Sequence, residues 1–290
     1  MFELYGIWHI LIILFPLIAS ALLIFFTRKL PQEKSFKIGF WISTVALIIL
    51  ILRSISYVIW GWLENPELSF FPRLFSRLLF ILPLQICHLA NIIFFIAYKK
   101  RSNILFGIGY AVNFPAALLA LVFAGDLQYL INTPNDFPFL QGFNAFVYII
   151  GHALLVIMPL FSLYHKHFKL NLKDAIKVII SLGILYIFFF GFDNIYNYVF
   201  YYKLANFSHS NYFFALWGQG GFPLETFTNI GKNIWAIDLA GGWFTFNPIY
   251  MAMTMGLGTV LIFLFYGIYL LLNWIFDFSK YRRTLNYEAH

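Results

Sequence analysis

The chain has 290 residues, of which 61% are hydrophobic and only 11% are charged, and its mean hydropathy is +0.79. A soluble domain of this length cannot cover so much apolar surface, so the composition excludes an ordinary soluble enzyme and indicates a protein embedded in a bilayer. A net charge of +7 would suggest a nucleic-acid partner in a soluble protein. Here the basic residues lie in short segments between apolar runs, so membrane topology explains them and we expect no nucleic-acid partner.

Seven apolar runs are each long enough to cross the hydrocarbon layer, which takes about 20 helical residues. Lipid-facing backbone must satisfy its own hydrogen bonds, so these runs predict helices. We therefore expect an all-α, polytopic transmembrane bundle that forms a single integral membrane domain over residues 1–290. The expected spans are 7–27, 38–62, 77–98, 103–124, 143–164, 174–195 and 248–274.

The basic residues alternate between the two sides of these spans. The first run is not read as a cleaved signal peptide, because its positive charge follows the run, at Arg28 and Lys29. Fourteen Lys and Arg side chains fall on one side and four on the other. The excess of positive charge marks the cytoplasmic side, so we expect the N-terminus outside and the C-terminus inside. The 37 Phe residues suit an AT-rich bacterial genome, which predicts a multi-pass protein of a bacterial plasma membrane.

The outer loops are long and aromatic. Residues 126–142 contain Pro134 and Pro138, and residues 196–247 contain clustered Tyr, Trp and Gly. Such punctuation favours irregular or re-entrant structure, and a loop of this length is more often functional than idle. The segment 196–247 is therefore either a lid or re-entrant region over a site, or an aromatic belt at the headgroups.

Four polar residues cluster in the third run, where each is costly in hydrocarbon. At about 100° per residue, Cys87 and Asn91 share a helical face, His88 lies one step round, and Gln85 completes the arc. Pro83 cannot donate a backbone hydrogen bond and is expected to kink the helix beside this arc. The arc predicts a face directed at a cavity or at other helices.

His152 lies at a depth in the fifth run that matches the depth of Cys87 in the third. A histidine can remove the proton from a thiol and return one to a leaving group, so the two side chains could form a nucleophile–base pair. The alternative is a small buried cysteine and a histidine bonded to a helix backbone. Sequence alone does not say whether their helices are neighbours.

Other polar residues lie inside the spans. Arg53 near the middle of the second run could snorkel, pair with Asp193, or hold a phosphate or carboxylate. Asn113, Asn194 and Asn197 could bind substrate or hydrogen-bond between helices.

No motif in the sequence indicates a cofactor. His165-Lys166-His167 has a chelating spacing, but it is expected in a solvated inner loop, and we predict no metal site. No phosphate-binding glycine loop, metalloprotease motif or serine nucleophile elbow is present, so no cofactor is expected.

The run Leu82-Pro83-Leu84-Gln85-Ile86-Cys87 resembles the proline–cysteine motif of the YwaF-like bacterial integral membrane proteins. His152 and the run Asn194-Ile195-Tyr196-Asn197-Tyr198 are similar to further motifs of that family, and the resemblance covers roughly residues 5–200 and the last span. Eukaryotic relatives of that family include a phospholipid acyltransferase that uses a cysteine and a histidine, and a more distant group hydrolyses fatty-acid esters. By this resemblance Cys87 would be the nucleophile and His152 the base, whereas the segment 203–247 is longer than the family's usual link.

Three classes of function remain open at this stage. The first is a membrane-embedded lipid acyltransferase or transacylase acting on phospholipid acyl chains, with a fatty-ester hydrolase as its variant. The second is a small-solute or lipid transporter with a polar intramembrane path, and the third is a sensor or scaffold. Membrane lipids are the expected partners, and the sequence does not indicate an oligomeric state. The residues assigned to substrate binding are Arg53, His88, Asn91, Asn113, Asn194 and Asn197.

Overall fold

A computed structural model describes residues 3–74, 77, 81–82, 85–132, 136–203, 224–238 and 244–288 of the chain. The described elements are almost entirely helical, with one two-stranded antiparallel hairpin. In chain order they are α1 (Ile7–Thr27), α2 (Gln32–Glu64), α3 (Phe70–Leu74), α5 (Ile86–Lys100), α6 (Asn103–Ile108), the π-helix η1 (Gly109–Asn113), α7 (Phe114–Val122), α8 (Gly125–Asn132), α9 (Pro138–Tyr164), α10 (Leu172–Tyr196), the π-helix η2 (Asn197–Lys203), α11 (Leu224–Ile234), β1 (Ile237–Asp238), β2 (Thr245–Phe246) and α12 (Pro248–Glu288).

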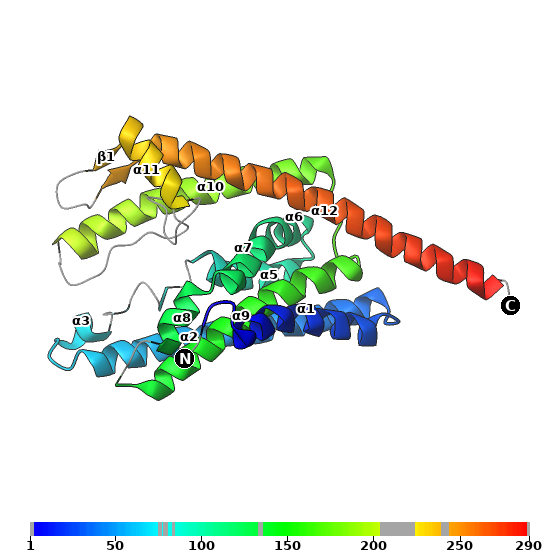
Figure 1. Ribbon diagram of the computed structural model, residues 1–290, viewed down its shortest axis with the longest axis horizontal. Helices are drawn as coiled ribbons and strands as arrows, with labels where there is room; N and C mark the ends of the chain where they lie inside the picture. Colours follow the sequence, from blue (N-terminus) through cyan, green and yellow to red (C-terminus); the bar gives the residue numbers. More distant parts are fainter. Residues whose placement is uncertain are drawn as a thin grey trace.

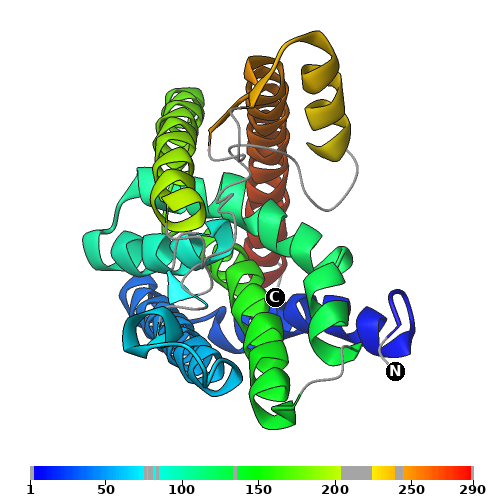
Figure 2. The ribbon, with the colours of Figure 1, turned by 90° about the vertical axis from the view of Figure 1, so that its left-hand side faces the viewer.

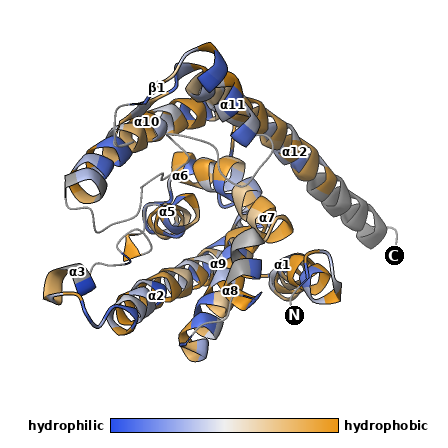
Figure 3. Ribbon diagram, turned by 60° about the vertical axis from the view of Figure 1, so that its left-hand side comes forward, coloured by the Kyte–Doolittle hydropathy of each residue, from blue (hydrophilic) through white to orange (hydrophobic). Residues whose placement is uncertain are grey.

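Six of the described helical stretches are long and apolar enough to cross a membrane, which confirms the predicted polytopic helical bundle. Hydrophobic residues run along the long helices (Figure 3). The stretch through α6, η1 and α7 counts as one span, because the π-helix continues the helical backbone between them. The six stretches are Ile7–Thr27, Gln32–Glu64, Asn103–Val122, Pro138–Tyr164, Leu172–Phe200 and Pro248–Ile275.

The remaining expected span, 77–98, differs from its prediction. Its helix α5 has only 15 residues and begins at Ile86, and Gln85 before it has extended backbone with φ −64° and ψ 147°. Gln85 is exposed and lies outside the helix, so it does not complete the predicted helical arc. Cys87 consequently lies in the first turn of α5 rather than in mid-helix. The kink expected at Pro83 lies outside the described residues.

The helices form two groups with a third between them (Figures 1 and 2). Helices α1, α2 and α9 pack together on one side, and α10, α11 and α12 pack together on the other. Between them lie α5, α6, η1 and α7, which contact both groups. In particular, α2, α5 and α9 pack against one another pairwise, and these are the helices that carry Arg53, Cys87 and His152.

Aromatic rings fill the centre of the bundle. Phe94 of α5, Phe106 of α6 and Tyr110 of η1 are fully buried in one core cluster, and Phe161 of α9 is fully buried as well. A Cβ atom at position 109 would collide with the Phe94 ring, so glycine at this position lets α5 and η1 approach closely. This contact fixes α5 against the middle of the molecule.

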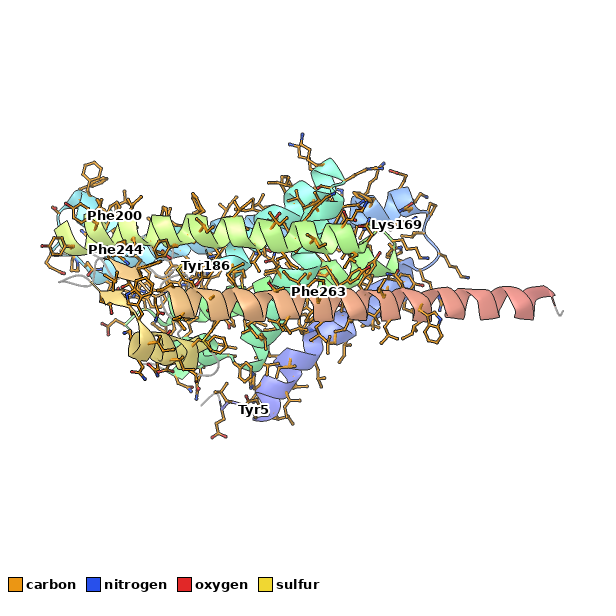
Figure 4. All side chains as sticks on the ribbon, turned by 90° about the horizontal axis from the view of Figure 1, so that it is seen from above. Tyr5, Lys169, Tyr186, Phe200, Phe244 and Phe263 are labelled. Carbon is orange, nitrogen blue, oxygen red and sulfur yellow. The ribbon has the colours of Figure 1, made fainter. Side chains whose placement is uncertain are left out.

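The basic loops gather at one end of the bundle, as the topology predicts. The loop after α9 contacts the α1–α2 connection through two histidines, because His165 bonds the Thr27 hydroxyl at 2.9 Å and His167 bonds the Ser35 hydroxyl at 2.9 Å. Lys169 lies at this end and Phe200 and Phe244 at the opposite one (Figure 4). We call the two ends the basic end and the outer end. The excess of positive charge predicts that the basic end is cytoplasmic.

The segment His165-Lys166-His167 is not the solvated loop that the sequence suggested. His167 is buried, and its ring contacts the rings of Phe36, Tyr98 and Phe161. The prediction was wrong because this burial depends on residues of α2, α5 and α9 that meet only in the fold. No group of three metal-ligating side chains is found among the described residues.

At the outer end, residues 126–132 lie in helix α8 (Gly125–Asn132), so this part of the expected irregular segment 126–142 is helical. The described parts of the expected lid, 196–247, are η2, α11 and the β1–β2 hairpin, and α11 packs against α12. Residues 204–223 and 239–243 lie outside the described part of the chain, so the lid remains a prediction.

Candidate functional site

Cys87 lies in the first turn of α5, directly after the backbone changes from extended at Gln85 to helical at Ile86. Its side chain is partly buried and packs against the central core. The Asn91 side-chain Nδ2 donates a hydrogen bond to the Cys87 carbonyl oxygen at 3.1 Å, so these two residues share a face of the helix as predicted. A helix N-terminus carries a partial positive charge, which stabilises an anion such as a thiolate beside it.

His152 is oriented by the turn of α9 that precedes it. Its Nδ1 atom lies 2.7 Å from the Tyr148 carbonyl oxygen, and the two rings are in contact with centroids 4.2 Å apart. Because a carbonyl only accepts hydrogen bonds, Nδ1 carries the proton and Nε2 keeps its lone pair. The side chain therefore has the tautomer that a general base requires.

The α9 segment around His152 is less tightly packed than its neighbours. All five residues from 148 to 152 are partly exposed, although residues 153 and 155–159 are buried. Apart from its two chain neighbours and the nearby backbone of α9, no described atom lies within 4 Å of the position that a Cβ atom of residue 151 would occupy. Five consecutive helical residues sweep more than a full turn, so α9 has space on more than one side at this level.

A hydrogen bond near the basic end sets the relative depth of Cys87 and His152. The Tyr98 hydroxyl of α5 lies 2.6 Å from the Ser162 hydroxyl of α9. At about 1.5 Å per residue, Cys87 lies about 16 Å and His152 about 15 Å from this bond, both toward the outer end. Since α5 and α9 pack against each other, the two residues lie at the same level on neighbouring helices.

Arg53, His88 and His152 occupy one neighbourhood. His88 lies close enough to Arg53 and to His152 for their charges to interact, and His152 is likewise within range of Arg53. Side chains lean toward the N-terminus of their helix, so Arg53 of α2 leans toward the basic end and His152 of α9 leans toward the outer end. The guanidinium carbon also lies 4.7 Å from the centre of the Tyr57 ring.

Several buried polar atoms near this neighbourhood lack a hydrogen-bond partner. They are the Nδ1 atom of His88, the Oδ1 atom of Asn91 and the Nδ2 atom of Asn113. All three side chains are more than 90% buried, and η1, which carries Asn113, packs against both α5 and α9. Buried polar groups are rarely left unsatisfied, so these atoms indicate positions where a polar group of a ligand or a water molecule binds.

The other two predicted substrate residues lie nearer the outer end. The Asn194 side chain accepts a hydrogen bond from the Thr245 backbone N–H at 2.9 Å and donates one to the Phe190 carbonyl oxygen at 2.9 Å. These bonds commit its amide to holding β2 against α10. Asn197 begins η2 and is fully buried. The role of both residues in substrate binding remains a prediction.

Two residues of the site were not singled out from the sequence. Tyr148 orients His152, and Tyr57 stacks under Arg53. Each lies four residues from its partner along a helix, which places the two side chains on one face. An aromatic residue at this spacing from an intramembrane His or Arg is the signal that could have found them.

The helices and the polar neighbourhood within them define a multi-pass α-helical membrane protein with ionisable side chains at intramembrane depth. The TMEM164 family matches residues 4–269, nearly the whole length, and the chain belongs to this family. Neither a curated protein nor a solved structure matches it.

Proposed function

We propose that this protein is a lipid acyltransferase that uses Cys87 as nucleophile and His152 as general base. The observation that carries the proposal is the common depth of the two residues on packed helices, with the Nε2 lone pair of His152 unused by its backbone bond. The resemblance to the YwaF-like proteins and their Cys/His acyltransferase relatives supports the same assignment. It also supports a bacterial plasma membrane as the location.

The proposed reaction has two balanced steps. In the first, the Cys87 sulfur attacks the ester carbonyl carbon of a phospholipid while His152 Nε2 takes the thiol proton. The sulfur–carbon bond forms, the ester carbon–oxygen bond breaks, and the proton passes to the departing lysophospholipid oxygen. In the second step, the hydroxyl of an acceptor lipid gives its proton to His152 and attacks the thioester, which restores the thiol. Water as the acceptor would make the protein a hydrolase.

Arg53 is the proposed ligand of the substrate's phosphate. A guanidinium forms strong paired hydrogen bonds with phosphate oxygens, and the nearby His88 and His152 add no negative charge that would oppose a phosphate. His88, Asn91 and Asn113 contribute the unsatisfied polar atoms that would bind the ester and glycerol oxygens. The same buried polar atoms without hydrogen-bond partners could also line a polar transport path, so transport is the competing function.

Acyl-enzyme formation tests the mechanism directly. Purified protein is incubated with phospholipid carrying a labelled acyl chain, and hydroxylamine is then used to release any thioester. We expect label on the wild type and none on Cys87→Ser, which has no other cysteine to accept it. His152→Gln should slow labelling by at least about a hundredfold, because general base catalysis typically contributes this much. Full turnover by Cys87→Ser would refute the mechanism, and absence of turnover by wild type across lipid classes would favour transport.

The role of Arg53 is tested with two substitutions, one that removes the positive charge and one that keeps the charge but changes the shape of the group. Arg53→Gln should reduce kcat/KM by about tenfold to a hundredfold, the loss expected for one charge-assisted pair. Arg53→Lys should recover part of this loss, since it keeps the charge without the paired geometry. Thermal unfolding of both variants is the control. An Arg53→Gln protein that unfolds early but turns over normally would assign Arg53 to structure.

A further inference from the structure

A groove with mixed chemistry lies at the basic end, between the start of α2 and the end of α5. Its volume is about 470 Å³, and it is far from the residues assigned to catalysis. Lys99 lies 12 residues beyond Cys87 on α5, which is about 18 Å at the helical rise. The lining residues are Phe36, Lys37, Phe40, Trp41, Tyr98, Lys99 and Arg101.

The floor of the groove is aromatic and rigid. The Tyr98 ring lies so close to Gly39 that a Cβ atom there would collide with it, which lets α5 rest on the backbone of α2. The Phe36 and Tyr98 rings meet edge to face with centroids 5.4 Å apart, and both are buried. The Tyr98 hydroxyl is held by Ser162 at 2.6 Å. The floor is therefore fixed by packing and does not depend on a ligand.

The rim of the groove is cationic. The Arg101 guanidinium binds both carboxylate oxygens of Glu33, at 2.7 and 2.6 Å, and lies 4.6 Å from the centre of the Phe36 ring. Lys37 and Lys99 are exposed, and neither forms an ion pair with a residue in the described ranges. Three cations thus face one carboxylate, which leaves an excess of positive charge at the rim.

The position of the groove along the helices identifies what can enter it. Lys37 lies in the second turn of α2 and Lys99 in the last turn of α5, so both ammonium groups are at the ends of membrane helices. Trp41 lies one turn deeper than Lys37 and is 65% exposed, as an interfacial tryptophan would be. A molecule in the groove would meet cations at the headgroup level and aromatic rings below it.

We propose that this groove is a binding site for an anionic phospholipid of the leaflet at the basic end. The negatively charged headgroup phosphate binds Lys37 and Lys99, with Arg101 held at the rim by Glu33. The first part of an acyl chain lies along Phe40 and Trp41. Clustered Lys and Arg side chains beside a membrane helix attract anionic lipids, and the aromatic floor adds a contact that a free phosphate ion cannot make. This proposal does not depend on the catalytic role of Cys87.

Native mass spectrometry of the delipidated full-length protein tests the site. The protein is titrated with phosphatidylglycerol and, separately, with phosphatidylcholine of the same acyl chains. We expect the double variant Lys37→Gln/Lys99→Gln to raise the Kd for phosphatidylglycerol by roughly tenfold or more, because each lysine near a lipid phosphate contributes roughly fivefold in affinity. Trp41→Ala should weaken phosphatidylglycerol binding severalfold, since it removes the acyl-chain contact.

The matched control is Lys34→Gln/Lys100→Gln, which removes the same charge from the same two helices outside the groove. It should leave the Kd within about twofold. Equal weakening by both double variants would mean diffuse attraction without a built site. Equal affinity for the two lipids would also overturn the proposal. A third arm uses inorganic phosphate alone, and equal stabilisation of the lipid-free protein by phosphate and by phosphatidylglycerol would assign the groove to a free anion. Because all four lysines are exposed, the variants are expected to fold, and their thermal unfolding confirms it.

Discussion

The two ends of helix α5 lie in different surroundings. At the basic end Ala97 and Tyr98 are buried, and the Tyr98 hydroxyl is bonded to Ser162. At the outer end Cys87 is only partly buried, and the first turns contain polar atoms of His88 and Asn91 without partners. On α5 itself, the Tyr98 hydroxyl at the basic end is bonded, whereas His88 and Asn91 at the outer end keep buried polar atoms without a bond. The unsatisfied end is therefore where we place the chemistry, and the packed end is where the helix is anchored.

The largest effect on stability is expected where α5 is packed into the core. Phe94→Ala should destabilise the protein by about 3–5 kcal/mol, because the ring is fully buried against η1 and its loss leaves a cavity. Ile96→Ala, which shortens an exposed side chain on the same helix, is the control and should cost under about 1 kcal/mol. Steric-trapping measurements of unfolding in bicelles would compare them. Equal losses would show that α5 is not anchored through the core.

A smaller effect is expected from pH, at the histidine that packs on Tyr98. Burial, together with the smaller effects of the nearby His165 and Arg101 charges, lowers the pKa of His167 to about 3. The Ser35 hydroxyl donates to the Gln32 carbonyl, so His167 Nε2–H donates to Ser35, and Nδ1 stays buried and unprotonated. The unfolded chain takes up a proton below about pH 6.5 and the folded protein does not, so stability falls as the pH drops.

Between pH 7 and pH 5 this linkage should cost about 2 kcal/mol. His167→Gln should be less stable at pH 7 but should lose most of this pH dependence. Unfolding of both proteins in the same detergent at the two pH values gives the comparison. An unchanged pH dependence in His167→Gln would show that other groups cause it.

The smallest changes in stability are expected from substitutions of polar groups on α5, and they should differ between a hydrogen-bonded group and an unbonded one. Tyr98→Phe should cost about 1 kcal/mol, the usual loss for one buried hydrogen bond. His88→Leu should change stability by less than about 0.5 kcal/mol or increase it, because an apolar group replaces a buried unsatisfied one. Activity should respond in the opposite order, with Tyr98→Phe near wild type and His88→Leu impaired. A large stability loss in His88→Leu would mean that its ring has a structural partner.

The long membrane-spanning helices could be predicted from the sequence, because hydropathy determines where they lie. Apolar runs flanked by basic residues located the six long spans, because hydrocarbon thickness fixes their length. The start of α5 at Ile86 was not predictable, since the expected kink at Pro83 assumed a helix on both sides of it. The matching depths of Cys87 and His152 followed from counting residues along the spans. Their placement on neighbouring helices required the packing of α5 on α9, which residue types do not encode locally.

The short length of α5 has a consequence for how a lipid would reach Cys87. Fifteen residues cover only about 22 Å, whereas the hydrocarbon layer is about 30 Å thick. The backbone ahead of the helix is extended at Gln85, and extended backbone cannot face lipid tails unless protein or water satisfies it. We therefore expect protein or water, rather than lipid tails, to surround this backbone, and polar surroundings to extend inward as far as the sulfur. A phospholipid could keep its headgroup hydrated and bring its ester bond down to Cys87, without the whole molecule sinking into the bilayer.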